Sequence, residues 1–219
     1  MTASDPATPA SHASGKTSPA LEQLLSRASR DDLVAPAPEG QTLETILAAA
    51  LRAPDHGRLR PWRYVAITGE ARPAFAHEVL AAIDRQEPEL PEKKREMRFA
   101  RFSTTPLVLA LGMHLQPESP IPVWEQEMAV GAAAMNVLNA LHLAGFGGKW
   151  ISGKFCDDPK LRESLGLKGD DRLAGFMFIG TPAGPRPVPG RPDPKAYLAF
   201  WKPGARVSFP VDRESAQPG

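Results

Sequence analysis

Apolar residues recur at helical spacing in residues 39–53, where Leu43, Ile46, Leu47 and Leu51 share one face. Similar spacing predicts helices over residues 19–28, 72–86, 123–148 and 158–167, and a polar, basic surface helix within 88–105. Apolar runs predict strands over residues 63–69, 106–115 and 171–182, with 149–155 forming a short strand or a loop. Few strands separated by helices indicate a mixed α/β architecture. No glycine-rich fingerprint follows a strand, which argues against a Rossmann domain.

One turn of the chain concentrates ionisable side chains between a predicted helix and a predicted strand. Asp55, His56, Arg58 and Arg60 follow one another in the loop of "APDHGRLRPWRYVAI", residues 53–67. An imidazole can donate to a ligand carbonyl or transfer a proton, and a guanidinium can stabilise negative charge or bind a phosphate. Alternatively, His56 caps a backbone group and Arg60 pairs with Asp55. The local sequence does not decide between these interpretations.

Two other stretches carry candidate binding groups. In "SRASR", Arg27 and Ser29 could hold a phosphate through a guanidinium fork and a hydroxyl, although a solvated helix end is the better explanation of these residues taken alone. In "GFGGKWISG", the backbone of residues 150–153 could run flat against a planar ligand and pair with its ring heteroatoms. The alternative for this stretch is an ordinary helix stop followed by a turn.

The longest predicted helix is rich in small residues, among them Gly131. A glycine inside a helix costs about 1 kcal/mol relative to alanine, so something must approach closely at this position. The approaching element is either another part of the same chain or a helix of a second copy. A metal site built from Asp55, His56, Glu125 and Glu127 lacks any recognised ligand spacing, and we expect no metal.

Composition narrows the choice of function. The 219 residues carry 26 basic and 25 acidic side chains, a net charge of +1, which argues against nucleic acid or a membrane surface as partner. A lone cysteine, Cys156, excludes an internal disulfide and favours the cytoplasm. We expect a disordered lead-in over residues 1–18, a single domain over 19–202 and a flexible tail over 203–219, because proline, serine and alanine dominate the ends.

Taken together, four stretches resemble the flavin-dependent nitroreductase family. They are "SRASR", "ILAAALRAPDHGRLRPWRYVAI", "PVWEQEMAVGAAAMNVLNALHLAGFGGKWISG" and "DRLAGFMFIGTP". The resemblance runs in order from about residue 21 to residue 200. It implies an α+β fold, with a central, mainly antiparallel sheet flanked by helices, in an intertwined homodimer that binds FMN at the subunit interface. It also implies NADH or NADPH as the reductant and a nitroaromatic, quinone or similar electron-poor compound as the acceptor.

The resemblance further implies roles for particular residues. Arg27, Ala28 and Ser29 would contact the FMN phosphate and ribityl chain, and Trp150, Ile151, Ser152 and Gly153 would lie along the flavin. His56 and Arg60 occupy loop positions where the wider family usually has Asn and Gln, and Arg60 departs even from the short subgroup that keeps His followed by Gln. His56 is a candidate proton donor, although the chemistry resides on FMN and no residue is identified as catalytic. The helix end 140–145 is a candidate nicotinamide contact. The alternatives are a non-catalytic flavin-binding or sensing module, a metal-dependent hydrolase and an interaction scaffold.

Overall fold

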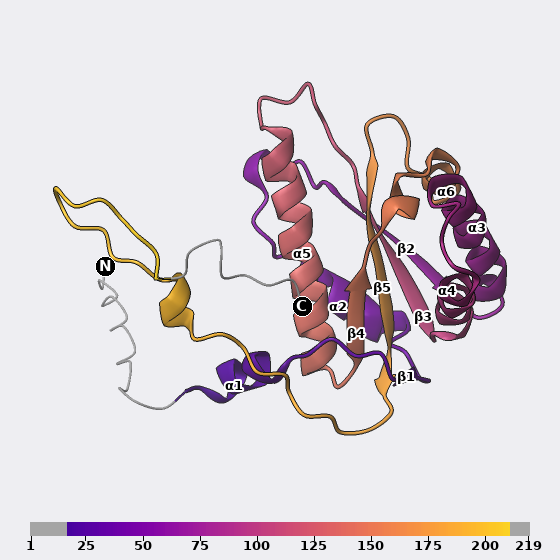
Figure 1. The fold of residues 1–219 in the computed structure, drawn as a ribbon, viewed down its shortest axis with the longest axis horizontal. Helices are drawn as coiled ribbons and strands as arrows, with labels where there is room; N and C mark the ends of the chain where they lie inside the picture. The colour runs from indigo at the N-terminus through magenta and orange to yellow at the C-terminus, as the bar shows by residue number, and fades with distance from the viewer. Residues whose placement is uncertain (1–16, 211–219) are drawn as a thin grey trace, which may run out of the picture. The chain divides into compact units, whose positions relative to one another are not determined.

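The computed structural model describes residues 17–210, which form parts of two compact units divided between Pro185 and Arg186 (Figure 1). Residues 1–16 of the expected disordered lead-in and residues 211–219 of the expected tail lie outside the described range. In the second unit, residues 186–210 contain a 3₁₀ turn at Pro194–Tyr197. They expose large apolar side chains such as Phe200 and Trp201.

The first unit contains the helices and strands. Its helices are α1 (Pro19–Ser26), α2 (Gly40–Ala50), α3 (Ala71–Gln86), α4 (Glu92–Thr104), α5 (Val123–Leu143) and α6 (Pro159–Ser164). Its strands are β1 (Leu33–Val34), β2 (Trp62–Thr68), β3 (Leu107–Met113), β4 (Gly147–Ile151) and β5 (Arg172–Pro182). The order across the sheet is β1-β5-β3-β2, with β4 also pairing with β5, and every pair is antiparallel. The α+β class with an antiparallel sheet flanked by helices is therefore confirmed.

The strands β3 and β5 are buried on both faces, which explains their nearly continuous apolar sequences. Because successive side chains of a strand point to opposite faces, Phe176 and Phe178 pack in one core and Met177 and Ile179 in another. Helices α3, α4 and α6 cover the first face, and α2 and α5 cover the second (Figure 1). The sheet therefore separates two helical layers.

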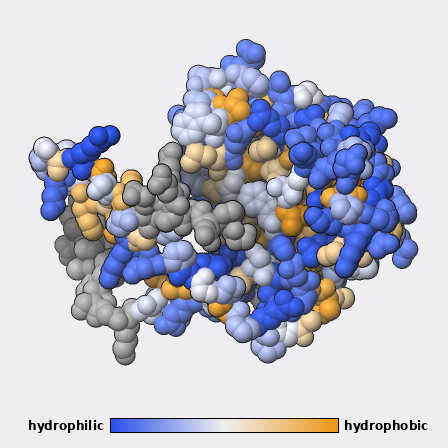
Figure 2. All heavy atoms as spheres, in the orientation of Figure 1, coloured by the Kyte–Doolittle hydropathy of each residue, from blue (hydrophilic) through white to orange (hydrophobic). Residues whose placement is uncertain are grey.

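Several boundaries differ from the sequence prediction. The long helix ends at Leu143 rather than at residue 148, because Gly145 adopts a left-handed φ of +82° and Gly147 begins β4. The short strand β1 was not predicted. The surface over α3 and α4 is mostly hydrophilic, as expected for the basic segment 88–105 (Figure 2).

A buried carboxylate joins α3 to the segment that follows β4. Asp158 accepts two hydrogen bonds from Arg85, at 2.7 and 2.8 Å, and its side chain is only 1% exposed. It also caps α6 by accepting from the backbone N–H of Leu161 at 2.9 Å. The Arg85 guanidinium holds the pKa of this carboxyl well below its usual range.

We predict that Asp158→Ala lowers the free energy of unfolding by about 2–4 kcal/mol, because it removes the cap and leaves Arg85 without its partner. Urea denaturation at pH 7 measures this change. Asp84→Ala is the control, because it breaks an exposed ion pair with Arg95 and should cost less than about 1 kcal/mol.

The cost of Asp158→Ala should also depend on pH. The pKa of Asp158 is lowered in the folded protein, so its contribution is complete above the unfolded pKa of about 4 and is lost as the pH falls below it. Equal losses for the two variants at pH 7, or a gap that widens in acid, would contradict this role.

Candidate functional site

The first stretch with predicted binding groups lies beside β4. The backbone N–H of Arg30 donates to the carbonyl of Gly148 at 3.3 Å, and Lys149 Nζ lies 2.8 Å from the Asp31 carboxylate. The chain from Arg27 to Asp31 therefore runs along the start of the strand that leads into residues 150–153. Two segments that are more than a hundred residues apart in the sequence meet here.

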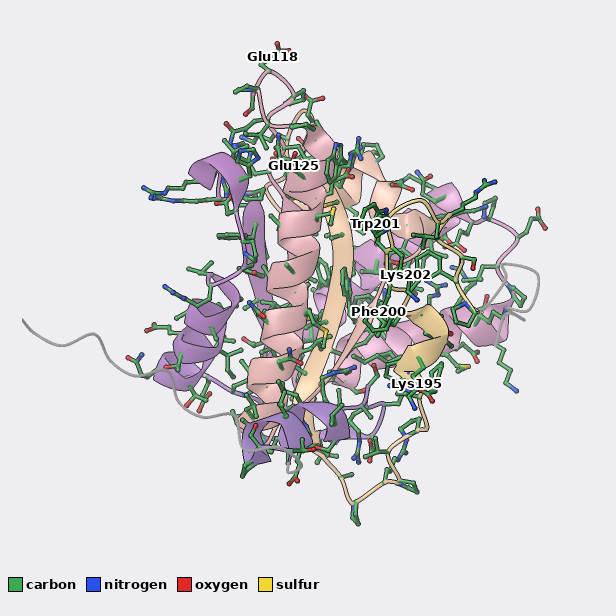
Figure 3. The ribbon with its side chains drawn as sticks, turned by 90° about the vertical axis from the view of Figure 1, so that its left-hand side faces the viewer. Glu118, Glu125, Lys195, Phe200, Trp201 and Lys202 are labelled. Atoms are coloured by element: carbon green, nitrogen blue, oxygen red, sulfur yellow. The ribbon has the colours of Figure 1, made fainter. Side chains whose placement is uncertain are left out.

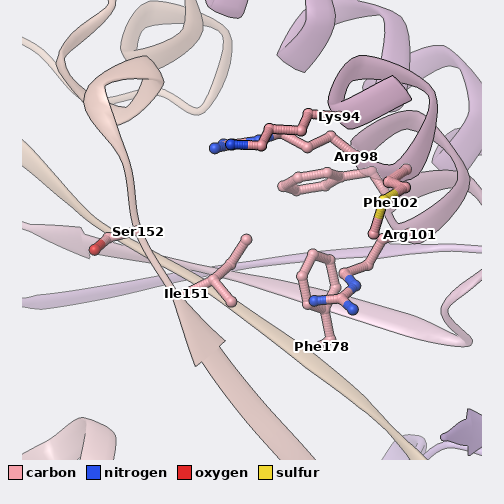
Figure 4. Close-up of a pocket in the computed structure, with 8 residues that line it drawn as sticks. Lys94, Arg98, Arg101, Phe102, Ile151, Ser152 and Phe178 are labelled. Carbon is pink, nitrogen blue, oxygen red and sulfur yellow. The ribbon is translucent and has the colours of Figure 1, made fainter. Parts of the chain in front are cut away.

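A pocket of about 270 Å³ opens between β4 and α4 (Figure 4). Ile151 and Ser152, both expected from the sequence, line one side of it. The other lining residues are Lys94, Met97, Arg98, Arg101, Phe102 and Phe178. The cations of α4 were missed by sequence reasoning, although Lys94, Arg98 and Arg101 recur at the spacing of one helical face.

The pocket is electropositive. Arg101 pairs with Asp31 at 2.9 Å, and Asp31 also binds Lys149. The guanidinium of Arg98 lies over the ring of Phe155, 4.9 Å from its centroid. Within residues 17–210, neither Lys94 nor Arg98 forms an ion pair, and both line the pocket one helical turn apart on α4 (Figure 4). Two neighbouring cations without a counter-ion repel each other, so this arrangement favours an anionic or electron-rich ligand.

The backbone of residues 150–153 is held close to β5. Gly175 has a φ of +129°, and a Cβ at this position would lie 2.2 Å from the carbonyl oxygen of Ile151. Only glycine allows this approach. The indole N–H of Trp150 donates to the carbonyl of Ala174 at 3.1 Å, which fixes its ring. At Gly153, a Cβ would lie 2.6 Å from the ring of Phe155.

The second predicted group of residues lies in the loop after α2. The Asp55 carboxylate accepts from the backbone N–H groups of Leu59, at 3.1 Å, and Arg60, at 2.9 Å. Asp55 thus holds the backbone of Arg60 rather than its side chain. Both Arg58, at φ +55°, and Arg60, at φ +51°, have left-handed backbone conformations, which are strained for such residues. His56 Nδ1 lies 2.7 Å from Glu125 Oε2 in the first turn of α5.

One chain does not bring these two groups together. His56 contacts Glu125 near the start of α5, whereas Ser26, next to Arg27, lies 2.9 Å from His142 Nε2 near its end. These two positions on α5 are 17 residues apart, about 26 Å at the rise of an α-helix. In addition, the pocket lies on the α4 face of the sheet and α5 covers the opposite face.

The helix end 140–145, the candidate nicotinamide contact, has an intramolecular partner. His142 Nε2 lies 2.9 Å from both Ser26 Oγ and the carbonyl oxygen of Gln23. This contact attaches α1 to α5, although α1 has no buried side chain of its own.

Three further observations concern metal ligands, the cysteine thiol and membrane-spanning helices. Across residues 17–210, no three His, Cys, Asp or Glu side chains converge as metal ligands, and Glu127 is engaged by Arg172. Burial raises the pKa of the Cys156 thiol to about 11, so it is a poor nucleophile at neutral pH. In the same range, every helix is too short or too polar to cross a bilayer.

Comparison with known proteins agrees with the resemblance seen in the sequence. Residues 27–181 match the profile of the Nitroreductase family. The chain is 35% identical over 185 residues to "Putative NAD(P)H nitroreductase YdjA" of Escherichia coli (strain K12), covering 83% of this chain and 99% of that protein.

Solved structures share the fold. A nitroreductase-like family protein from Bacillus cereus superposes with a TM-score of 0.72 at 24% identity, covering 87% of this chain and all of that one. A nitroreductase with bound FMN from Bacteroides fragilis gives a TM-score of 0.66 at 19% identity, covering 85% of this chain and all of that one. The profile match, the sequence identity and the shared fold together establish that the chain belongs to the nitroreductase family.

Proposed function

We propose that the protein is an FMN-dependent NAD(P)H oxidoreductase that acts on nitroaromatics, quinones or similar electron-poor acceptors in the cytoplasm. The observation that carries the proposal is the electropositive pocket between β4 and α4, to which Asp31 joins the segment 27–31 through ion pairs with Arg101 and Lys149. The pocket is lined by Ile151 and Ser152, which the resemblance places along a flavin, and by the cations of α4, which the sequence did not predict. Family membership, the name of the YdjA relative and the FMN bound to the relative from Bacteroides fragilis support this assignment.

The groups that we propose for the site match the parts of FMN. Arg27, Ala28 and Ser29 would hold the phosphate through a guanidinium, backbone N–H groups and a hydroxyl. The backbone of residues 150–153 would face the edge of the ring. Arg98, which has no carboxylate partner among residues 17–210, would stabilise the negative charge that a reduced flavin carries. When bound, FMN supplies hydride transfer between reduced nicotinamide and the acceptor.

We further propose that two chains complete each FMN site in a homodimer. His56 contacts α5, which covers the face of the sheet opposite to the pocket, so His56 and the nearby Arg60 would serve the pocket of a second copy. An exposed apolar stripe on α5, formed by Trp124, Met128, Met135 and Leu143, offers a surface for that copy. A Cβ at Gly131, on the same helix, would have no atom within 4 Å, so nothing in its own chain explains this glycine.

The first test is the visible spectrum of the purified protein. We expect the yellow colour of bound FMN and its loss on addition of NADPH, with recovery when a quinone is supplied. Protein that is colourless and does not take up added FMN would refute the proposed function. Protein that keeps its FMN but never reacts with NADH or NADPH would instead be a non-catalytic flavin-binding module.

We predict that Arg98→Gln weakens binding of reduced FMN about tenfold or more relative to oxidised FMN, because the charge-assisted interaction with the reduced ring contributes about 1.5–3 kcal/mol. Fluorescence titration gives the Kd of oxidised FMN, and the reduction potential of the bound flavin gives the ratio of the two Kd values. Arg95→Gln is the matched control on α4, because Arg95 pairs with Asp84 and does not line the pocket. The prediction fails if the two variants have the same flavin potential.

We predict that Gly131→Leu splits the dimer and releases FMN without unfolding the chain, because the added side chain blocks only an approaching partner. Sedimentation gives the oligomeric state and circular dichroism the helix content. Gly131→Ala, which adds a single methyl group and favours the helix by about 1 kcal/mol, is the control. A Gly131→Leu protein that remains a fully flavinated dimer would show that nothing approaches this position.

A further inference from the structure

We propose that Glu125 is a positioning residue that holds His56 as the proton donor to the acceptor bound in the partner's pocket. This inference rests on the proposed function and extends it. It starts from the 2.7 Å contact between His56 Nδ1 and Glu125 Oε2, which joins two residues 69 positions apart. A carboxylate on one ring nitrogen fixes the tautomer and the orientation of an imidazole and leaves the other nitrogen available.

The exposure of the two side chains fits a sheltered Glu125 that holds an exposed, proton-donating His56. The Glu125 side chain is 28% exposed and the His56 side chain is 65% exposed, so the carboxylate is the sheltered member of the pair. Glu125 lies in the first turn of α5, where the helix dipole stabilises its negative charge (Figure 3). The proposed donor is the imidazolium form, which donates Nδ1–H to the Glu125 carboxylate and carries the transferable proton on Nε2.

The surroundings hold this pair in one arrangement. Gln126, which is buried beside Glu125, accepts from the backbone N–H of Gln116 at 2.9 Å and donates to its carbonyl at 3.0 Å. Gln116 Nε2 reaches the carbonyl of Leu59 at 3.3 Å. Together with the Asp55 contacts, these bonds connect the first turn of α5 to the loop that carries His56. The network therefore fixes the first turn of α5, and with it Glu125, relative to the loop.

Other charged groups near His56 do not replace Glu125. The elements packed around His56 carry Asp55, Arg58 and Arg60 in its own loop, Glu118 in the loop before α5, and Glu125 and Glu127 on α5. The Asp55 carboxylate accepts from backbone N–H groups and Glu127 pairs with Arg172. Within the described residues, Glu125 is the carboxylate that contacts the imidazole.

The proton balance of the reaction requires such a donor. A quinone gains a hydride, supplied by reduced nicotinamide through the cofactor, and needs one further proton to become a hydroquinone. In the proposed step, the Nε2–H bond of His56 breaks and an O–H bond forms on the acceptor. Neutral imidazole remains, with Nδ1–H donated to Glu125, and water returns the proton to Nε2.

The test compares Glu125→Gln with Glu127→Gln in the flavin-loaded protein. Glutamine can donate to a ring nitrogen as well as accept from one, so it no longer fixes the tautomer, and the ¹⁵N chemical shifts of the His56 ring should move toward those of mixed tautomers. Glu127→Gln, two positions along the same helix, should leave those shifts unchanged. The NMR measurement does not depend on turnover, so it reports on the pair directly.

Kinetics then separate proton delivery from structure. With a quinone at pH 7, kcat should fall about three- to tenfold in Glu125→Gln, while FMN content and reduction by NADPH stay unchanged. With ferricyanide, which takes electrons without protons, the rate should stay at the wild-type level. Because His56 is also proposed to complete the FMN site, the rates are expressed per bound FMN. On that basis His56→Gln should lower the quinone rate further, and adding Glu125→Gln to it should cost nothing more, because the carboxylate acts only through the imidazole.

Each result bears on one claim. Unchanged ¹⁵N shifts of the His56 ring in Glu125→Gln, or equal losses with quinone and ferricyanide, would overturn the positioning role while leaving the oxidoreductase assignment intact. A wild-type protein that binds no FMN or does not react with NADPH would instead refute the proposed function itself.

Discussion

The structure depends on β5, a strand whose side chains are buried on both faces of the sheet. It pairs with β1, β3 and β4, so three segments from distant parts of the sequence take their positions from it. Its alternating side chains build two separate cores, with α4 over one and α5 over the other. Gly175 lets β4 lie close enough to β5 to present residues 150–153 beside α4. Because α4 and α5 cover opposite faces of the sheet, His56, which contacts α5, lies away from the pocket of its own chain.

The balance of paired and unpaired cations makes the pocket positively charged. The net charge of the chain is only +1, yet three cations of α4 point into one small space. Asp31 neutralises part of this charge by binding Arg101 and Lys149, and it also fixes the segment that begins at Arg27. Arg98, held over the ring of Phe155, keeps its charge available to a ligand. A local field can therefore be strong in a protein whose overall charge is balanced.

Much of the fold could be predicted from the sequence, because periodicity reports directly on which face of an element is buried. The apolar runs of β3 and β5 and the helical spacing of α2 predicted those elements well. A strand of two residues such as β1 has no periodicity to detect. The end of α5 depended on which of several glycines takes a left-handed conformation, and composition alone does not reveal that.

The candidate site could be predicted where local motifs suggest it, but not where contacts between distant residues create it. The segment 150–153 and the loop around His56 became candidates through their composition and by resemblance. Arg98 was not, because a basic stripe on a helix is usually a solvated face. The pairing of His56 with Glu125 joins residues 69 positions apart, and no spacing rule connects them.

The claim that two chains complete each FMN site is tested most directly by mixing defective protomers. One variant lacks the phosphate-binding groups through Arg27→Ala and Ser29→Ala, and the other lacks the loop groups through His56→Ala and Arg60→Ala. Each alone should bind FMN poorly, but after dissociation and reassociation every mixed dimer should regain one intact site, counted as one FMN per heterodimer. Failure of the mixture to bind more FMN than either variant alone would contradict a site shared between chains.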